Sequence, residues 1–172
     1  LDEAHSVGAL GPSGKGVVEY WGCDPREVDV MMGTLTKSFA AAGGYIGGSV
    51  ALIRHIRATS AGACYGACMS PPVVQQVRSA MRIMLGEDGT DIGQRKAERL
   101  LRNSRYFRTR LRQLGFIVYG HDDSPVVPLL TFYITKVVCF GRETLKRGVG
   151  IVSVGFPATP LTQARARFCI SA

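Results

Sequence analysis

The sequence lacks the features that mark membrane-spanning, zinc-binding and disulfide-rich proteins. No apolar run reaches the roughly 20 residues that a membrane-spanning helix needs. The five cysteines form neither a zinc-type spacing nor an even disulfide framework. Cys64 and Cys68 lie close in sequence, but no second pair or histidine cluster completes a metal site. We therefore expect reduced thiols in a cytosol-facing protein, and no metal.

The sequence also has no internal repeat and no low-complexity tract. Its 21 basic and 13 acidic residues give a formal net charge of +8, which favours an anionic partner such as a phosphate-bearing ligand, a nucleic acid or a membrane surface. Many of the basic residues, however, fall between Arg95 and Arg112 at spacings that place them on the solvent face of one helix. We favour a solvated helix face over a nucleic-acid site, because no aromatic-interleaved basic motif accompanies these residues.

A chain of 172 residues can bury one sizeable core and has room for one domain or parts of two. It begins at Leu1, in what reads as the end of a strand, and stops at Ala172 inside an apolar run. We therefore expect an internal piece of a larger protein.

The stretch from Val28 to Phe39 is the most informative part of the chain. An apolar run leads into Thr34-Leu35-Thr36-Lys37-Ser38, a small hydroxyl-rich turn with one lysine, and the glycine-rich segment 43–48 follows. A lysine at the end of a buried strand is partly desolvated, which favours the neutral amine, a nucleophile toward aldehydes. Hydroxyl donors and glycines together suit a phosphate. From this stretch alone, an ordinary surface lysine at a strand end is an equally good interpretation.

A second polar cluster stands at the start of the chain. Asp2 lies at a strand end, and the glycine-rich segment 7–16 that follows reads as a loop. A short helix over 17–21 and the strand from Val28 come next. Loop, helix and strand between Asp2 and Lys37 form a crossover unit, which predicts two strands of one sheet with both polar residues at the same edge. Proteins of the α/β class often place chemistry there.

The rest of the pattern mixes helices and strands. Ser70 and two prolines predict a helix start, Thr90 or Asp91 can cap a long helix, and Gly115 ends it. From about residue 90 we expect a separate α+β unit. The expected elements are strands at 45–48, 116–119, 126–133, 149–154 and 166–171, helices at 50–57, 71–86, 91–114 and 137–146, and a loop of small residues at 61–69.

Several motifs together resemble the α-oxoamine synthase family of fold-type I pyridoxal-phosphate enzymes. They are Asp2-Glu3-Ala4-His5-Ser6, the loop 11–16, the lysine turn 33–39 and the glycine segment 43–48. The motifs at 29–33, 123–128, 155–160 and 165–171 are similar to those of the second, catalytic subunits of eukaryotic serine palmitoyltransferases. The resemblance spans essentially the whole chain. Asp-Glu-Ala-His alone also occurs in helicases, but here it lacks a Walker-type loop and stands with the lysine turn at the family spacing.

This resemblance implies an α/β fold. Residues 1–89 would be the C-terminal part of the large pyridoxal-phosphate-binding domain, a mostly parallel sheet with flanking helices, and residues 90–172 a truncated small α+β domain. The implied reaction condenses L-serine with palmitoyl-CoA to 3-ketosphinganine, CoA and CO2, the first step of sphingolipid biosynthesis. The implied partner is the first subunit, which lacks the lysine. Segments outside this chain would associate with the endoplasmic reticulum membrane, on its cytosolic face.

The same resemblance assigns roles to residues. Lys37 would hold pyridoxal phosphate covalently and then move the α-proton of serine. Asp2 would face the pyridine nitrogen, where a carboxylate keeps the ring protonated. His5 matches the position that contacts the ring oxygen of the cofactor. Thr34 and Thr36 match positions that hydrogen-bond the phosphate or the ring substituents.

Two arginines near the C-terminus also bear on the resemblance, and one pair of residues departs from the family pattern. Arg167 matches the arginine that binds the substrate carboxylate, a task that suits a bidentate guanidinium, and Arg165 fits an exposed or structural role at least as readily. Segment 155–160 corresponds to a mobile loop over the substrate. Ala67-Cys68 stands where the family usually has a Thr-Ser pair that reaches the cofactor phosphate of the neighbouring subunit.

Two alternatives remain open at this point. One is another α-oxoamine synthase, of the 5-aminolevulinate synthase, aminoketobutyrate ligase or 8-amino-7-oxononanoate synthase type. The other is a weakly active or non-catalytic paralogous subunit. Lys37, Asp2, His5 and Arg167 speak against a non-catalytic subunit, while Ala67-Cys68 speaks mildly for it.

Overall fold

The segment that carries Asp2 pairs with the strand that leads to Lys37, as the crossover pattern predicted. A computed structural model describes all residues, 1–172. Asp2 forms a parallel bridge with Met32 of strand β1 (Val30–Thr34), and the Glu3 amide donates to the Met32 carbonyl at 2.7 Å. Strand β2 (Gly44–Gly48) pairs with β1 in the antiparallel sense. The predicted parallel pairing is therefore confirmed at this one bridge, although the Asp2 segment does not form the full strand that the sequence predicted.

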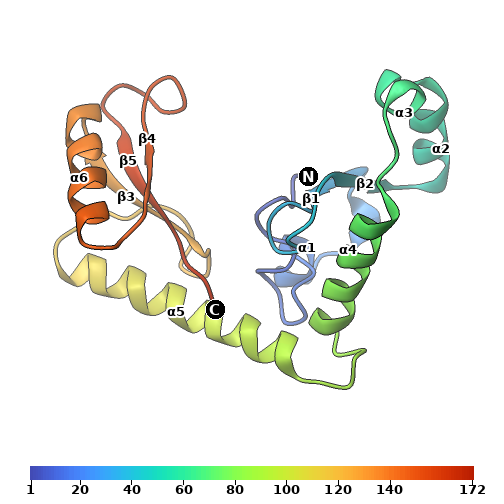
Figure 1. Cartoon of the computed structure of the whole chain (residues 1–172), viewed down its shortest axis with the longest axis horizontal. Coiled ribbons are helices and arrows are strands. Elements are labelled where there is room, and N and C mark those ends of the chain that lie inside the picture. The colour runs from blue at the N-terminus through green and yellow to red at the C-terminus, as the bar shows by residue number, and fades with distance from the viewer. The chain divides into compact units, whose positions relative to one another are not determined.

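The chain divides into two compact units, Leu1–Ala97 and Glu98–Ala172. The division falls within helix α5 (Ile92–Gln113), the longest helix (Figure 1). The domain boundary predicted near residue 90 stays a prediction. Of the predicted site residues, five belong to the first unit, namely Asp2, His5, Thr34, Thr36 and Lys37, and Arg167 belongs to the second.

The helices of the first unit precede β1 or follow β2 along the chain. Helix α1 (Val17–Tyr20) and the 3-10 helix η1 (Pro25–Glu27) lie between Asp2 and β1. Helices α2 (Val50–Thr59) and α4 (Pro71–Met84) follow β2 along the chain. Val77 of α4 packs with Leu35 and Phe39, and these three buried side chains form the centre of the core. The turn that carries Lys37 is thereby anchored directly to the core of its unit.

The stretch 61–69, which we predicted to be a loop, instead contains helix α3 (Ala61–Tyr65). Ser60 ends α2, and its hydroxyl accepts a hydrogen bond from the Ala63 amide at 3.2 Å, which caps the new helix. Alanine has the highest helix propensity, so a capped alanine-rich turn becomes helical. Helices α2 and α3 lie side by side (Figure 1).

The second unit is an antiparallel sheet with a helix on one face. The strands β3 (Val126–Phe132), β4 (Val152–Val154) and β5 (Ala164–Cys169) pair in the order β3-β5-β4. Helix α6 (Ile134–Lys146) covers one face of this sheet (Figure 1). Val137 of α6 packs on Leu129, Ala164 and Ala166. No helix of the structure combines the length and apolar character that crossing a membrane requires.

The strand predicted at 116–119 is wrong, because only Val118 forms a bridge there, to Leu129. The Tyr119 amide donates to the Pro128 carbonyl at 3.0 Å. Pro128 has no N–H to return that hydrogen bond, so the ladder stops after one bridge.

A second correction concerns the basic face of α5. Arg102 and Arg110 are exposed as predicted, but Arg108 is only 1% exposed. Its guanidinium donates to the carbonyls of Tyr119, Ser124 and Val126, the last at 3.1 Å. Burial, together with the positive charge of Arg112, lowers the pKa of Arg108. Arg108 is therefore part of the core and not of a solvated face.

Candidate functional site

Two buried apolar side chains fix the turn that carries Lys37. Leu35 and Phe39 are 4% and 2% exposed, and the polar residues between them, Thr36, Lys37 and Ser38, are exposed. The Ala41 amide donates to the Leu35 carbonyl at 2.9 Å, which closes the turn. The predicted desolvation of Lys37 is thus wrong for this segment. Leu35 and Phe39 are buried in the core, whereas the Lys37 side chain is exposed to solvent.

Two threonine hydroxyls lie next to this lysine. Thr34 is the last residue of β1, and its Oγ1 is 2.8 Å from the Oγ1 of Thr36. The Thr36 amide donates to the Thr34 hydroxyl at 3.3 Å. The pair forms a small group of hydroxyl donors on the same turn as Lys37, which suits an anionic oxygen.

Asp2 and His5 come from the segment that pairs with β1. Asp2 is exposed, and its Oδ1 accepts a hydrogen bond from the Ala4 amide at 2.8 Å. Because this segment runs parallel to β1, the residues after Asp2 and the residues after Met32 lie at the same edge of the sheet. His5 is exposed in the turn that follows Asp2. The structure therefore brings the first-unit residues of the predicted site to one edge.

Glu3 holds the surrounding loop in place. Its side chain is fully buried, and Oε2 accepts hydrogen bonds from the Ser6 hydroxyl and, at 2.9 Å, from the Val17 amide. The Val18 amide donates to Oε1 at 3.3 Å. At Gly16, where φ is 104°, a Cβ would lie 2.5 Å from Oε2, so only glycine fits. The sequence analysis gave Glu3 no role. Its position next to Asp2 could have indicated a buried side chain, since neighbouring side chains in an extended segment point to opposite sides.

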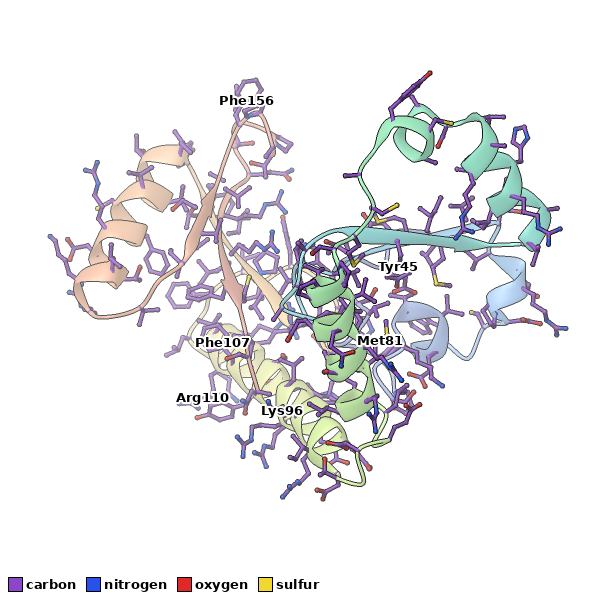
Figure 2. All side chains as sticks on the ribbon, turned by 45° about the vertical axis from the view of Figure 1, so that its right-hand side comes forward. Tyr45, Met81, Lys96, Phe107, Arg110 and Phe156 are labelled. Atoms are coloured by element: carbon purple, nitrogen blue, oxygen red, sulfur yellow. The ribbon has the colours of Figure 1, made fainter.

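The glycine loop packs against the lysine turn. A Cβ on Gly8 would lie 2.3 Å from the Cβ of Ser38. On the other side of β1, Tyr45 of β2 lies opposite Gly33, and a Cβ on Gly33 would lie 2.6 Å from the Tyr45 ring (Figure 2). Burial, and then the negative charge of Glu3, raise the pKa of Tyr45. These close approaches explain why glycine recurs around the turn.

Arg167 lies in the second unit, on β5. It is opposite Pro128 of β3 and Val152 of β4, on the face of the sheet turned away from α6. Arg165, two positions earlier, lies on the same face, with its guanidinium 5.9 Å from the centre of the Tyr119 ring. The predicted binding of the substrate carboxylate by Arg167 stays a prediction.

The chain is similar to named proteins over its whole length. It is 69% identical over 172 residues to "Serine palmitoyltransferase 3" of Caenorhabditis elegans and 59% identical to "Serine palmitoyltransferase 2" of the same organism. It matches a solved structure of SPT with PLP internal aldimine, with a TM-score of 0.85, 27% identity, and coverage of 98% of this chain and 41% of that chain.

This chain aligns with only part of each relative. All of this chain aligns, but it spans 34% and 31% of the two nematode relatives, about a third of their length. The α/β architecture predicted from the sequence is confirmed by the solved structure. The family model for aminotransferase class I and II matches residues 1–172. The chain therefore belongs to the aminotransferase class I and II family.

Proposed function

We propose that the protein carrying this chain is a pyridoxal-phosphate-dependent acyltransferase that condenses L-serine with palmitoyl-CoA to 3-ketosphinganine, CoA and CO2. The names of the relatives and their identity over the whole chain support this reaction. The observation that carries it is the parallel bridge at Met32, which brings the Asp2 segment beside the strand that leads to Lys37. The presence of Lys37 favours a catalytic subunit, of the second or third type, over a lysine-lacking one.

The first unit offers groups that fit a pyridoxal phosphate. The Lys37 amine is exposed, the Asp2 carboxylate is exposed, and the hydroxyls of Thr34 and Thr36 lie on the lysine turn. In this proposal Lys37 would hold the aldehyde carbon, Asp2 would hold a proton at the pyridine nitrogen, and the threonines would donate to the phosphate or the ring substituents. His5 would contact the ring oxygen of the cofactor. When bound, the cofactor supplies a sink for the electron pair left at the serine Cα.

The other residues act on the substrates. The Lys37 amine would accept the proton from the serine Cα. The Arg167 guanidinium binds the serine carboxylate with two N–H donors before that group leaves as CO2. The serine Cα forms a bond to the palmitoyl carbonyl carbon, the thioester C–S bond breaks, and CoA leaves. The bond from Cα to the carboxylate then breaks to release CO2, and Cα takes up a proton in its place.

The proposal extends to the assembly of the whole protein. We assign residues 1–89 to the large domain and 90–172 to the small domain. We further propose a heterodimer with the lysine-lacking first subunit, and association with the endoplasmic reticulum membrane through segments outside this chain. Ala67 and Cys68 are both exposed. They lack the hydroxyl that, in the family pattern, reaches the cofactor phosphate bound to the neighbouring subunit.

The test uses the whole protein, purified with its partner subunit. The wild type is expected to show the visible absorbance of lysine-bound pyridoxal phosphate, and to release CoA from palmitoyl-CoA faster with serine than with glycine or alanine. Lys37→Ala is expected to remove the absorbance band and to lower turnover at least about a hundredfold, because the covalent anchor and the proton acceptor are lost.

Lys96→Ala is the matched control, because Lys96 is an exposed lysine on α5 (Figure 2). It should keep both the absorbance band and the turnover. An unchanged spectrum in Lys37→Ala would overturn the lysine assignment. Faster turnover with glycine or alanine would favour another α-oxoamine synthase.

A further inference from the structure

Two arginines share an otherwise apolar face of the second unit's sheet. In β5, Ala164 and Ala166 point into the core under α6, so Arg165 and Arg167 point to the opposite face. Residues two apart on a strand are about 7 Å apart, close enough to act on one ligand. Their cross-strand neighbours are Leu130 and Pro128 on β3, and Val154 and Val152 on β4. None of these neighbours is acidic.

Arg165 has no structural partner that accounts for its charge. The side chain is partly buried, and its Nε is buried without a hydrogen-bond partner. Its recorded contact is with the ring of Tyr119, whose centre is 5.9 Å from the guanidinium. An aromatic ring orients a guanidinium by a cation–π interaction and leaves its N–H groups available. The structural role expected for Arg165 is therefore not supported by any hydrogen bond or ion pair.

The buried Nε of Arg165 has lost its hydration without gaining a hydrogen bond from the protein. An oxyanion would compensate for the lost hydration by accepting two parallel N–H···O hydrogen bonds from the guanidinium. The Tyr119 ring already limits the orientation of the group, so less conformational freedom is lost when an anion binds.

We propose that Arg165 binds an oxyanion group of a substrate, beside Arg167 on the same sheet face. The inference rests on the proposed function, because that function supplies two substrates with such groups. The carboxylate of the amino acid and the phosphates of the acyl-CoA share this chemistry, and the experiment distinguishes them.

The experiment measures steady-state kinetics of the holoenzyme, assembled from the whole protein and its partner subunit. Each substrate is varied at a saturating concentration of the other, in the wild type, Arg165→Gln and Arg165→Lys. The Gln variant is expected to raise one KM about tenfold or more with kcat changed less than about threefold, since a charged hydrogen bond is lost in binding. The Lys variant keeps the charge and loses the planar pair of donors, so its KM should rise about threefold.

Arg102→Gln is the matched control, because Arg102 is an exposed arginine of the same unit. Its KM values should equal those of the wild type. A raised KM for serine alone assigns the anion to the carboxylate, and a raised KM for palmitoyl-CoA alone assigns it to the phosphates; both results support the proposal.

Wild-type KM values for both substrates in the Gln variant would refute the inference. If that variant does not fold, unchanged KM values in the Lys variant would refute it equally. A wild-type enzyme that turns over neither substrate contradicts the proposed function instead, so the two failures are distinguishable.

Discussion

At the scale of single residues, two adjacent acids have opposite environments. The Asp2 carboxylate is exposed at the sheet edge, whereas the Glu3 carboxylate is fully buried beneath the glycine loop. The alternation of an extended segment produces this difference, since one side chain faces outward and the next faces the interior. Asp2 is therefore available to a ligand, and Glu3 sets the position of the segment that carries it.

Glu3→Gln is expected to lower the free energy of unfolding of the whole protein by about 1–3 kcal/mol. A glutamine can accept from Ser6 and Val17 with its oxygen, but its NH2 group then faces the Val18 amide, so two donors meet. Urea denaturation measures the change. Glu27→Gln, at an exposed acid of the same unit, should change stability by less than about 0.5 kcal/mol. Equal effects of the two substitutions would show that Glu3 is not the anchor described.

At the scale of elements, Arg108 completes the edge of β3 where the backbone cannot. Pro128 has no N–H to donate to the Tyr119 carbonyl, and the Arg108 guanidinium donates to that carbonyl instead. The same guanidinium donates to the Ser124 and Val126 carbonyls and so ties α5 to the start of β3. The Arg108 side chain thus replaces the backbone hydrogen bond that Pro128 cannot donate.

Arg108→Met should lower the free energy of unfolding of the whole protein by about 2–4 kcal/mol, because it leaves buried carbonyls without donors. Arg110→Met, on the outer side of α5, removes one hydrogen bond to Gln113 and should cost less than about 0.5 kcal/mol (Figure 2). Urea denaturation compares the two. A loss in Arg108→Met no larger than in Arg110→Met would contradict the role assigned to the buried guanidinium.

Sequence reasoning succeeded where the signal was local or set by connection rules. The crossover from Asp2 to Lys37 was predictable, because loop, helix and strand in that order favour parallel pairing. Arg108 was not, because helix spacing places a charged residue on a face without showing which carbonyls lie beneath it. For Glu3, its place beside Asp2 indicated an inward-facing side chain, but its partners at Val17 and Val18 come together only on folding and could not be predicted. The functional roles of Lys37 and Arg167 remain predictions.

At the scale of the whole molecule, most of the groups proposed to hold the cofactor are exposed to solvent within this segment, and Thr34 is partly exposed. Asp2, Thr36 and Lys37 are exposed, and the chain spans about a third of the length of its nematode relatives. Water competes with a ligand for exposed groups, and its high dielectric constant weakens their attraction for charge. The strength of cofactor binding should therefore depend on parts of the protein beyond these residues.

Residues 1–172 produced alone are expected to bind pyridoxal phosphate at least about tenfold more weakly than the whole protein, which corresponds to about 1.4 kcal/mol of binding free energy. Absorbance titration at the visible band of the lysine-bound cofactor measures both dissociation constants. Lys37→Ala in the segment is the control, because any binding that survives this substitution comes from other lysines. Equal affinity of the segment and the whole protein would mean that the edge formed by Asp2 and the lysine turn is sufficient by itself, and that exposure of these groups does not limit binding.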